Sequence, residues 1–325
     1  MSGATVAYGE RTGSGFVRGF PAYAWSVLIY NLAVILWGAL VRATGSGAGC
    51  GGHWPLCNGD VLPASPQVAT IIEFTHRAMS GVALVTAAIL AAWGWKAFPP
   101  RHPARRWAAW SLVFMLTEAL IGAALVLLGH VAKDESVGRV YSLSLHLINT
   151  FLLLASLALT AWWSTRAPED QPRTTTHRGR GQLVLGIVAL VVVAMAGVIT
   201  ALGDTLFPAH SLAQGIADDF AGTASFLIRL RVIHPALGIG AAIFIAFLAV
   251  RQRRASEIAS LRMLSKLLLI LLAAQIAVGS FTVVLRAPLP MQLLHLLVAD
   301  TLWITLVIFT SEQLHTNAAG GARRS

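Results

Sequence analysis

The sequence predicts an all-α, polytopic membrane protein with eight transmembrane helices, and three of its features lead to that prediction. Hydrophobic residues make up 56% of the 325 residues and charged residues only 12%, and the mean hydropathy is +0.69. Soluble domains carry about 25% charged residues. Apolar runs of bilayer length recur along the chain, and basic residues gather in alternate loops. We therefore expect the chain to lie in a lipid bilayer.

The apolar runs set the expected number of helices. A helix needs about 20 apolar residues to cross a bilayer. Runs near that length occupy residues 23–43, 70–95, 107–129, 140–163, 181–203, 230–250, 263–285 and 291–311. The first run follows Arg11 and Arg18 and has no small-residue cleavage site after it, so we expect a retained helix and not a cleaved signal peptide.

Lys and Arg residues are sorted between alternate loops, which predicts the orientation. The loops after the second, fourth and sixth runs contain Lys96, Arg101, Arg105, Arg106, Arg166, Arg173, Arg178, Arg180, Arg251, Arg253, Arg254, Arg262 and Lys266. Because such residues favour the cytoplasmic side, we expect both termini to be cytoplasmic, in the cell membrane, and residues 45–60 to be extracytoplasmic. These loops and their attraction to anionic lipid explain the net charge of +10 without a nucleic-acid partner.

The chain aligns with itself as two halves of four runs each. EFTHRAMSGVAL in the second run aligns with RVIHPALGIGAA in the sixth, the segments around His146 and His295 align, and Glu118 aligns with Gln275. An even number of spans gives both halves the same direction, which predicts a pseudo-two-fold axis along the membrane normal. The expected domains are a four-helix bundle at 1–163, a cytoplasmic linker at 164–180 and a second four-helix bundle at 181–325.

Four histidines lie at similar depth in the predicted helices: His76, His146, His234 and His295. Each stands about 6–10 Å below the outer boundary at a rise of 1.5 Å per residue, and each half contributes two. Two neutral imidazoles facing each other across a bundle can bind a haem iron axially, whereas a structural zinc site needs four ligands. The pattern favours a bis-histidine haem site in each half. Hydrogen-bonded packing, a proton relay and an ion pathway are the alternatives.

The two halves differ three residues before the first histidine of each. Glu73 stands before His76, and Arg231 stands before His234, which places each on the helical face of its histidine. A carboxylate beside a haem could accept or relay protons, whereas an arginine could bind a haem propionate. This asymmetry predicts chemistry in the first half and a resident electron-transfer haem in the second. Alternatively, Glu73 pairs with Arg77, itself a candidate propionate ligand, and Arg231 anchors the helix at the interface.

Two further carboxylates stand deep in the predicted helices. Glu118 is costly near the middle of a membrane unless it is paired or protonated. It is a candidate for a proton path or for an interhelical hydrogen bond. Asp300, five residues after His295, is open to the same two interpretations.

The cysteines of the chain, Cys50 and Cys57, lie in the glycine-rich stretch GSGAGCGGHWPLCNGD. They are even in number and are predicted to face the oxidising side, so a disulfide is expected. It would hold a lid over the first-half haem pocket, because the loop leads directly into the helix of Glu73. A thiol–disulfide relay and a Cys–His–Cys metal site with His53, which would lack a fourth ligand, are the alternatives.

Together, the segments VRATGSGAGCGGHWPLCNG and EFTHRAMSG, the four histidines and the duplication resemble the haem A synthase family. The resemblance is to the bacterial type with a cysteine pair in its first outer loop, and it covers essentially the whole membrane region. The Trp-Pro-Leu-Cys and Glu-x-x-His-Arg segments are its most specific parts. The loop at 204–228 has no counterpart that we can align.

The resemblance implies an activity and a set of site residues. The family oxidises one ring methyl of haem O, through alcohol and gem-diol stages, to the formyl group of haem A for haem-copper terminal oxidases. It implies that His76 and His146 attend the substrate haem, that His234 and His295 hold a haem b, and that Glu73 is catalytic. Haem O synthase and terminal-oxidase assembly factors are the partners to expect, and a homo-oligomer is an open alternative.

Three other functions compete with this one. A di-haem cytochrome b acting with a quinol would have similar histidines but would not need Glu73 in one half alone. A membrane thiol oxidoreductase would need a second cysteine pair, which the chain lacks. A transporter is disfavoured, because the duplication is parallel and no helix shows the paired Gly/Pro interruptions of a midplane site.

Overall fold

The fold is helical throughout the part of the chain that the computed structural model describes, residues 18–64, 66–166, 179–208, 211–221 and 226–321. Eight helices in these ranges are long and apolar enough to cross a membrane, and no β-strand occurs there, which confirms the predicted fold class. They are α2 (Phe20–Ala43), α3 (Val68–Ala97), α4 (Pro103–Leu127), α5 (Val137–Ser164), α6 (Arg180–Leu206), α9 (Ile233–Ala255), α10 (Ala259–Val284) and α11 (Leu289–Gly321). Two short helices, α7 (Leu212–Phe220) and α8 (Phe226–Arg229), lie between α6 and α9.

The helix bounds lie within a few residues of the predicted runs, and α9 departs most. The predicted run starts at residue 230, whereas α9 begins at Ile233, after the 3-10 turn η3 (Leu230–Val232). Pro235 explains the difference, because proline fits the first turn of a helix but breaks a helix interior. Arg231 therefore lies in this 3-10 helix, three residues before His234 and directly before α9.

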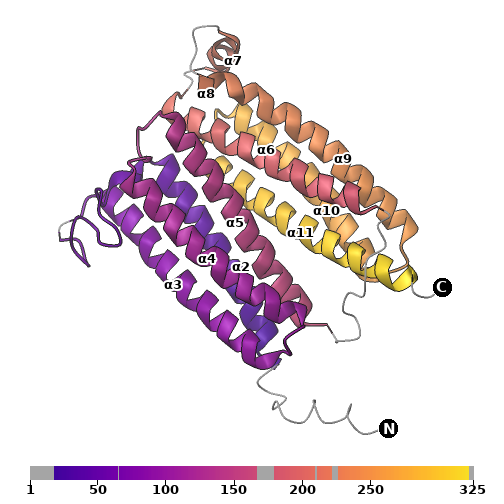
Figure 1. The fold of residues 1–325 in the computed structure, drawn as a ribbon. Helices are drawn as coiled ribbons and strands as arrows, with labels where there is room; N and C mark the ends of the chain where they lie inside the picture. Colours follow the sequence, from indigo (N-terminus) through magenta and orange to yellow (C-terminus); the bar gives the residue numbers. More distant parts are fainter. Residues whose placement is uncertain (1–17, 65, 167–178, 209–210, 222–225, 322–325) are drawn as a thin grey trace.

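The membrane helices form two groups of four, seen side by side in Figure 1. In the first group α2, α3, α4 and α5 close a ring, because each contacts the next and α5 returns to α2. In the second group α6, α9, α10 and α11 close a ring in the same chain order. A duplication of a four-helix unit would give this pattern. It supports a division at 1–163, 164–180 and 181–325, which stays a proposal because most of the linker lies outside the described residues.

Helices α5 and α11 form the centre of the molecule. Along their membrane-spanning parts they are 61% and 50% buried, against 11–33% for the other six helices. They contact each other, and α5 also contacts α6 as α11 contacts α2. A two-fold axis between α5 and α11 would exchange these last two contacts. At this junction the ring of Trp303 stacks on that of Phe151, with 4.5 Å between ring centres, and its indole N–H donates to the Phe151 carbonyl.

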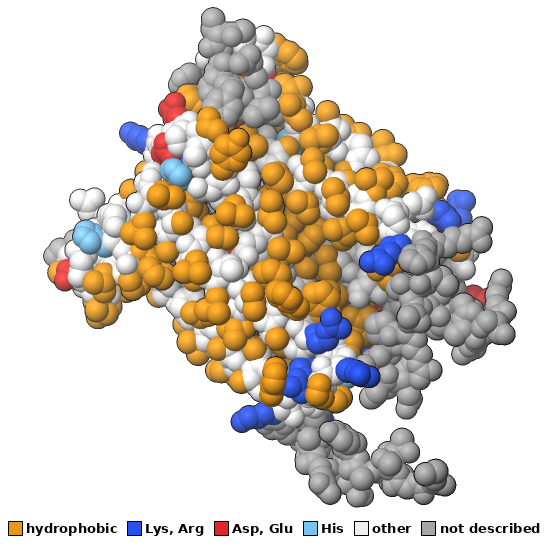
Figure 2. Space-filling model, in the orientation of Figure 1, with side chains coloured by type: hydrophobic (Ala, Val, Ile, Leu, Met, Phe, Trp, Pro, Cys, Tyr) orange, Lys and Arg blue, Asp and Glu red, His pale blue; other side chains and the backbone are white. Residues whose placement is uncertain are grey.

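The two ends of the bundle differ in character. One end, here called the disulfide end, has the loops 44–67 and 128–136 and the segment with α7 and α8; the other, the basic end, has the loops 98–102 and 256–258 and the start of α2 (Figure 1). Figure 2 shows apolar side chains over the middle of the face drawn and Lys and Arg side chains toward the basic end. Exposed apolar residues on the membrane helices include Val85, Ile89, Leu120, Ile243 and Phe247. An apolar surface of this kind suits lipid.

Glu312 of α11 joins the two groups of helices at the basic end. Its carboxylate accepts hydrogen bonds from the indole N–H of Trp162 on α5 at 3.0 Å and from the hydroxyl of Ser260 on α10 at 2.8 Å. The guanidinium of Arg166, just after α5, lies 3.4 Å from the same carboxylate. The residue is only 6% exposed, so these contacts are shielded from water.

We predict that Glu312→Ala lowers stability by about 2 kcal/mol, because hydrogen bonds to a buried charged group contribute about 1.5–3 kcal/mol. Thermal unfolding of the detergent-solubilised protein measures the effect. Glu257→Ala is the matched control, since Glu257 is exposed in the loop at the same end. An unfolding midpoint that is equal in both variants would contradict the assigned role of Glu312.

Candidate functional site

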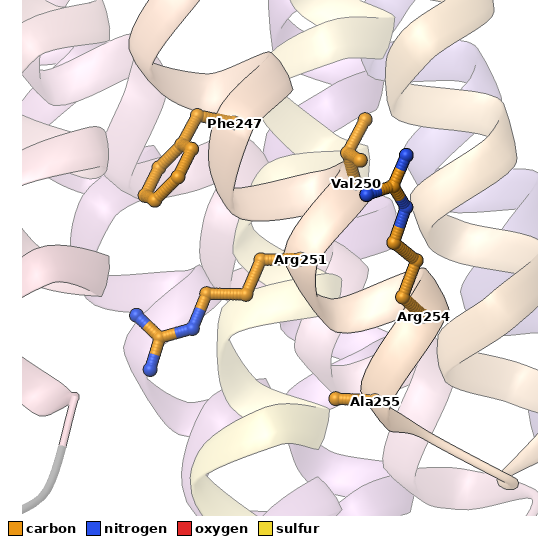
Figure 3. Close-up of a pocket in the computed structure, with 5 residues that line it drawn as sticks. All are labelled: Phe247, Val250, Arg251, Arg254 and Ala255. Atoms are coloured by element: carbon orange, nitrogen blue, oxygen red, sulfur yellow. The ribbon is translucent and has the colours of Figure 1, made fainter.

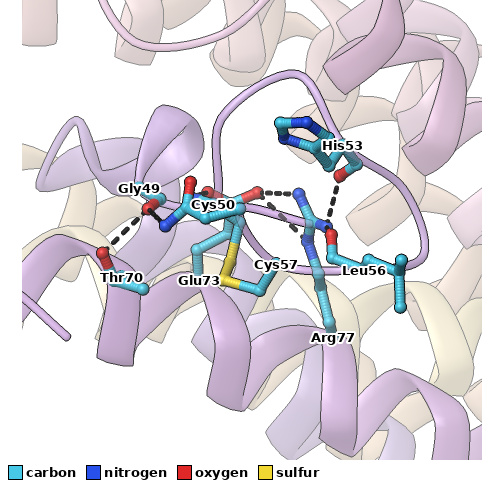
Figure 4. The surroundings of a disulfide bond; sticks show 9 residues. Gly49, Cys50, His53, Leu56, Cys57, Thr70, Glu73 and Arg77 are labelled. Atoms are coloured by element: carbon cyan, nitrogen blue, oxygen red, sulfur yellow. Dashed lines mark hydrogen bonds and ion pairs between the residues drawn. A yellow bond between two sulfur atoms is a disulfide. The ribbon is translucent and has the colours of Figure 1, made fainter. Parts of the chain in front are cut away.

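Glu73 on α3 binds the disulfide loop (Figure 4). One carboxylate oxygen accepts the backbone N–H of Cys50 at 2.8 Å, and the other accepts two N–H groups of Arg77 at 2.6 and 3.2 Å. The guanidinium of Arg77 also donates to the carbonyls of His53 and Leu56, each at 2.6 Å. Glu73 is only 3% exposed. The ion pair that the sequence offered as the alternative role of Glu73 is therefore present, and it fixes the loop to α3.

The loop itself is closed by a disulfide between Cys50 and Cys57, as predicted. Both cysteines are buried, at 0% and 1% exposure. Since both sulfurs are bonded to each other, the Cys–His–Cys metal site with His53 is wrong. Gly49 lets the loop lie directly on α3, because a Cβ there would stand 2.5 Å from the backbone of Ala69.

Three of the four histidine rings pack against glycines on neighbouring helices. A Cβ added to Gly38 would lie 2.9 Å from the ring of His76, and one added to Gly197 would lie 2.9 Å from the ring of His234. Gly279 has the same relation to His295. Gly38 and Gly197 occupy matching places on α2 and α6. The absence of a Cβ at these points makes room for imidazole rings inside each group of helices.

The imidazole nitrogens have an unusual hydrogen-bonding state. Nδ1 of His76, His146 and His295 is buried with no hydrogen-bond partner among the described residues. Nδ1 of His234 lies 3.1 Å from the Val193 carbonyl, so that its donation there leaves Nε2 as an acceptor. A buried polar atom without a partner costs about 1–3 kcal/mol. Such nitrogens are expected where a metal or a ligand completes the site.

The second-half pair has the spacing of two axial ligands. The ring centres of His234 and His295 lie 6.3 Å apart. Two metal–imidazole bonds of about 2 Å, with about 1 Å more from each nitrogen to its ring centre, place the centres about 6 Å apart. The ring separation therefore matches the one expected for two imidazoles that bind one iron.

His146, the second histidine of the first half, lies beside Glu118 of α4. Its Nδ1 is 3.6 Å from a carboxylate oxygen of Glu118. The same carboxylate accepts the amide N–H of Asn149 at 2.5 Å and the hydroxyl of Thr150. Glu118 thus makes interhelical hydrogen bonds between α4 and α5, one of the two roles offered from the sequence. Asp300 is 1% exposed, and its Oδ2 has no hydrogen-bond partner among the described residues.

Arg231 is engaged by protein groups at the disulfide end. Its guanidinium lies 3.2 Å from the carboxylate of Asp204 and 4.0 Å from that of Asp219, and it donates to the carbonyls of Gly203 and Phe207. Burial raises the pKa of Asp219, and the charge of Arg231 opposes that shift. Arg231 thus ties the segment after α6 to the start of α9, a role that the sequence did not reveal.

Arg42 is a further residue that sequence reasoning missed. From the end of α2 its guanidinium donates to the carbonyl of Ala201 at 2.8 Å and the hydroxyl of Thr205 at 3.1 Å, both on α6, and to the side chain of Gln292 on α11 at 3.3 Å. It therefore links the two groups of helices near the disulfide end. The signal in the sequence was the position of Arg42, a basic residue beside a loop that is predicted to be poor in basic residues.

A separate groove of about 540 Å³ opens at the other end of α9. Figure 3 shows its lining residues, which are Phe247, Val250, Arg251, Arg254 and Ala255. Arg251 is 17 residues after His234, or about 25 Å along the helix at 1.5 Å per residue. The groove is thus not part of the histidine sites.

The fold and these sites define a polytopic helical membrane protein in which each group of four helices contains two half-buried histidines. The chain matches the COX15-CtaA family, described as cytochrome oxidase assembly protein, over residues 21–307, and it belongs to that family.

Individual relatives agree with the family. A Thermus thermophilus protein named Protoheme IX farnesyltransferase is 45% identical over 298 residues, which cover 91% of this chain and 48% of that protein. Heme A synthase of Alkalihalophilus pseudofirmus is 43% identical over 98 residues, 30% of this chain and 33% of that one. Heme A synthase of Geobacillus kaustophilus is 38% identical over 140 residues, 43% and 44% of the two chains. The chain thus spans about half or less of the length of each of these relatives.

We predict that Gly279→Ala displaces the His295 ring and lowers the amount of bound iron porphyrin about tenfold, since overpacking costs about 1–3 kcal/mol. Pyridine haemochrome spectra of the purified variant measure iron porphyrin per protein. The matched control is Gly240→Ala on α9, where an added Cβ meets nothing within 4 Å. Equal porphyrin content in the two variants would refute the role given to the glycines.

We predict that replacing both Cys50 and Cys57 with serine lowers stability by about 2.5 kcal/mol, because the disulfide closes a short loop in the unfolded chain. Thermal unfolding measures this change, and a turnover assay on the same preparation distinguishes a structural clasp from a redox relay. A clasp gives lowered stability with turnover retained at low temperature. Unchanged stability with turnover abolished would contradict it.

Proposed function

We propose that this protein is a haem A synthase that oxidises a ring methyl of haem O to the formyl group of haem A. Membership of a family described as cytochrome oxidase assembly protein supports the proposal, as do the relatives named Heme A synthase. The observation that carries it furthest is structural: Glu73 and His76 stand on one helix, under a closed disulfide loop.

The first group of helices is the proposed site of the reaction. His76 and His146 would bind the iron of haem O, and the absence of a Cβ at Gly38 makes room for the His76 ring. The disulfide loop would cover the pocket, because Arg77 fixes its carbonyls to α3. A closed pocket keeps bulk water from the reacting methyl group.

The second group of helices is the proposed site of a resident haem b. His234 and His295 would be its axial ligands, in agreement with their ring separation of 6.3 Å. When bound, this group supplies single-electron transfer. Arg231, the proposed propionate ligand, is already paired with Asp204. We propose that Arg231 instead holds the segment after α6 in place above the site.

Glu73 is the proposed catalytic carboxylate, acting in proton removal or in stabilising a cationic stage of the substrate. Three N–H donors hold the carboxylate in one orientation. Preorganised charge of this kind needs little rearrangement when positive charge develops nearby. The same contacts mean that Glu73 also fixes the loop, so the test of its role must separate the two effects.

The proposed topology puts both termini and the basic end in the cytoplasm and the disulfide end outside the cell membrane. Lys96, Arg251 and Arg254, among others, gather at the basic end. Basic residues near helix ends favour the cytoplasmic side. A disulfide at the other end agrees with an oxidising compartment.

A protohaem farnesyltransferase is the proposed partner. In the Thermus protein of that name, a segment similar to this chain makes up about half of the length. We infer that the present protein works beside such an enzyme, which would supply haem O.

The activity is tested by expressing the protein in a host that makes haem O and has no haem A synthase of its own. We predict that extracted pigment contains haem A or its alcohol precursor with the unaltered protein. Glu73→Gln should abolish conversion, whereas Arg77→Gln, which loosens the loop but leaves the carboxylate, should lower it about tenfold or less. Glu135→Gln, an exposed residue at the disulfide end, is the control.

Three results would contradict different parts of the proposal. Recovery of haem b alone, without conversion by the unaltered protein, would support a di-haem electron-transfer protein. Equal losses in Glu73→Gln and Arg77→Gln would leave Glu73 with the loop-anchoring role alone. Should His234→Ala retain an unchanged low-spin haem b spectrum, the resident haem would have to lie elsewhere.

A further inference from the structure

Glu118 on α4 stands directly behind the imidazole of His146 on α5. The Nδ1 atom of His146 is 3.6 Å from Oε1 of Glu118, and it has no hydrogen-bond partner among the described residues. A displacement of about 1 Å would form a charge-assisted hydrogen bond, for which 2.7–2.9 Å is the usual length. The two groups are thus placed to interact through Nδ1 of His146.

The carboxylate of Glu118 is itself held in position. The amide of Asn149 donates to Oε2 at 2.5 Å, and the hydroxyl of Thr150 donates to Oε1. Asn149 is in turn fixed by the hydroxyl of Thr117 at 2.6 Å and by its own donation to the Phe114 carbonyl at 2.9 Å. A carboxylate fixed by its neighbours can orient a ligand that it contacts.

The second half lacks this arrangement. Gln275 aligns with Glu118, and its Nε2 lies 3.2 Å from Nε2 of His295. Val298 and Ala299 occupy the places of Asn149 and Thr150, and neither side chain can donate a hydrogen bond. The two halves therefore share their histidines but differ in the group beside the second histidine, a carboxylate in one half and an amide in the other.

We propose that Glu118 is a positioning residue, whose carboxylate accepts a hydrogen bond from Nδ1–H of His146. This interaction would fix the tautomer of the imidazole, leave Nε2 for the substrate iron and make it a more basic ligand. The proposal rests on the proposed function, since it takes His146 to be a ligand of haem O.

The consequence is a difference in iron redox potential between the halves. A more basic ligand beside a negative charge stabilises ferric over ferrous iron. The first-half site therefore has the lower midpoint potential of the two. Replacing the carboxylate by an amide should raise it.

The test is a redox titration of the full chain loaded with haem O. The double variant His234→Ala, His295→Ala removes the second-half ligands, so that the remaining signal comes from the first half. Adding Glu118→Gln to it should shift the ferric-to-ferrous equilibrium about tenfold toward ferrous iron. For one electron, this raises the midpoint potential by about 59 mV. Glu135→Gln in the same background is the control and should leave the potential unchanged.

Each outcome bears on one claim. If Glu118→Gln leaves the midpoint potential unchanged while haem O is still bound, the positioning role is overturned and the proposed function stays intact. A lowered unfolding temperature in that variant would then show that Glu118 is a packing residue. If the double variant binds no haem O while Glu118 is present, the first-half site itself fails, and the proposed function with it.

Discussion

Imidazole nitrogens that lack hydrogen-bond partners inside a membrane protein are the constraint on which the rest of the structure depends. No water in the hydrocarbon layer can satisfy them. Nδ1 of His76, His146 and His295 is in this state among the described residues. The neighbouring glycines make room for the rings. A porphyrin iron would bind one nitrogen of each ring, and the other nitrogen would then carry the proton and need a hydrogen-bond acceptor. The polar groups nearest each histidine then decide how each site behaves.

The disulfide loop extends this arrangement to the surface. Glu73 accepts the N–H of Cys50 and pairs with Arg77, which in turn binds two loop carbonyls. One turn further along α3 lies His76. The loop, the carboxylate and the proposed substrate ligand are therefore connected through a single stretch of helix, and a change in any of them affects the others. Among the described residues the second half has no equivalent connection, because Arg231, in the 3-10 helix before α9, pairs with Asp204.

Much of this could be predicted from the sequence, because in a membrane the signals are strong. Runs of about 20 apolar residues and alternating basic loops predict the helices, and an even cysteine pair predicts the disulfide. The contacts of Arg42 and Arg231 could not be predicted, since they join segments far apart in the chain and depend on how the helix ends meet. Nor could the start of α9 at Ile233, directly after the 3-10 helix η3. The glycines beside the rings are visible in the sequence, and Gly279 aligns with Gly122 when the two halves are compared, but the role of these glycines depends on helix packing. An added Cβ meets nothing at Gly122, where His146 lies beside Glu118 instead.

The central claim is that one scaffold holds a substrate porphyrin in its first half and a resident haem in its second. An electron cryo-microscopy structure of the protein purified with haem O tests this claim most directly. The account predicts a farnesylated porphyrin with its iron between His76 and His146, beneath the disulfide loop, and a haem b with its iron between His234 and His295. Iron density away from these imidazoles, or a porphyrin in one half alone with the other half closed by side chains, would contradict it.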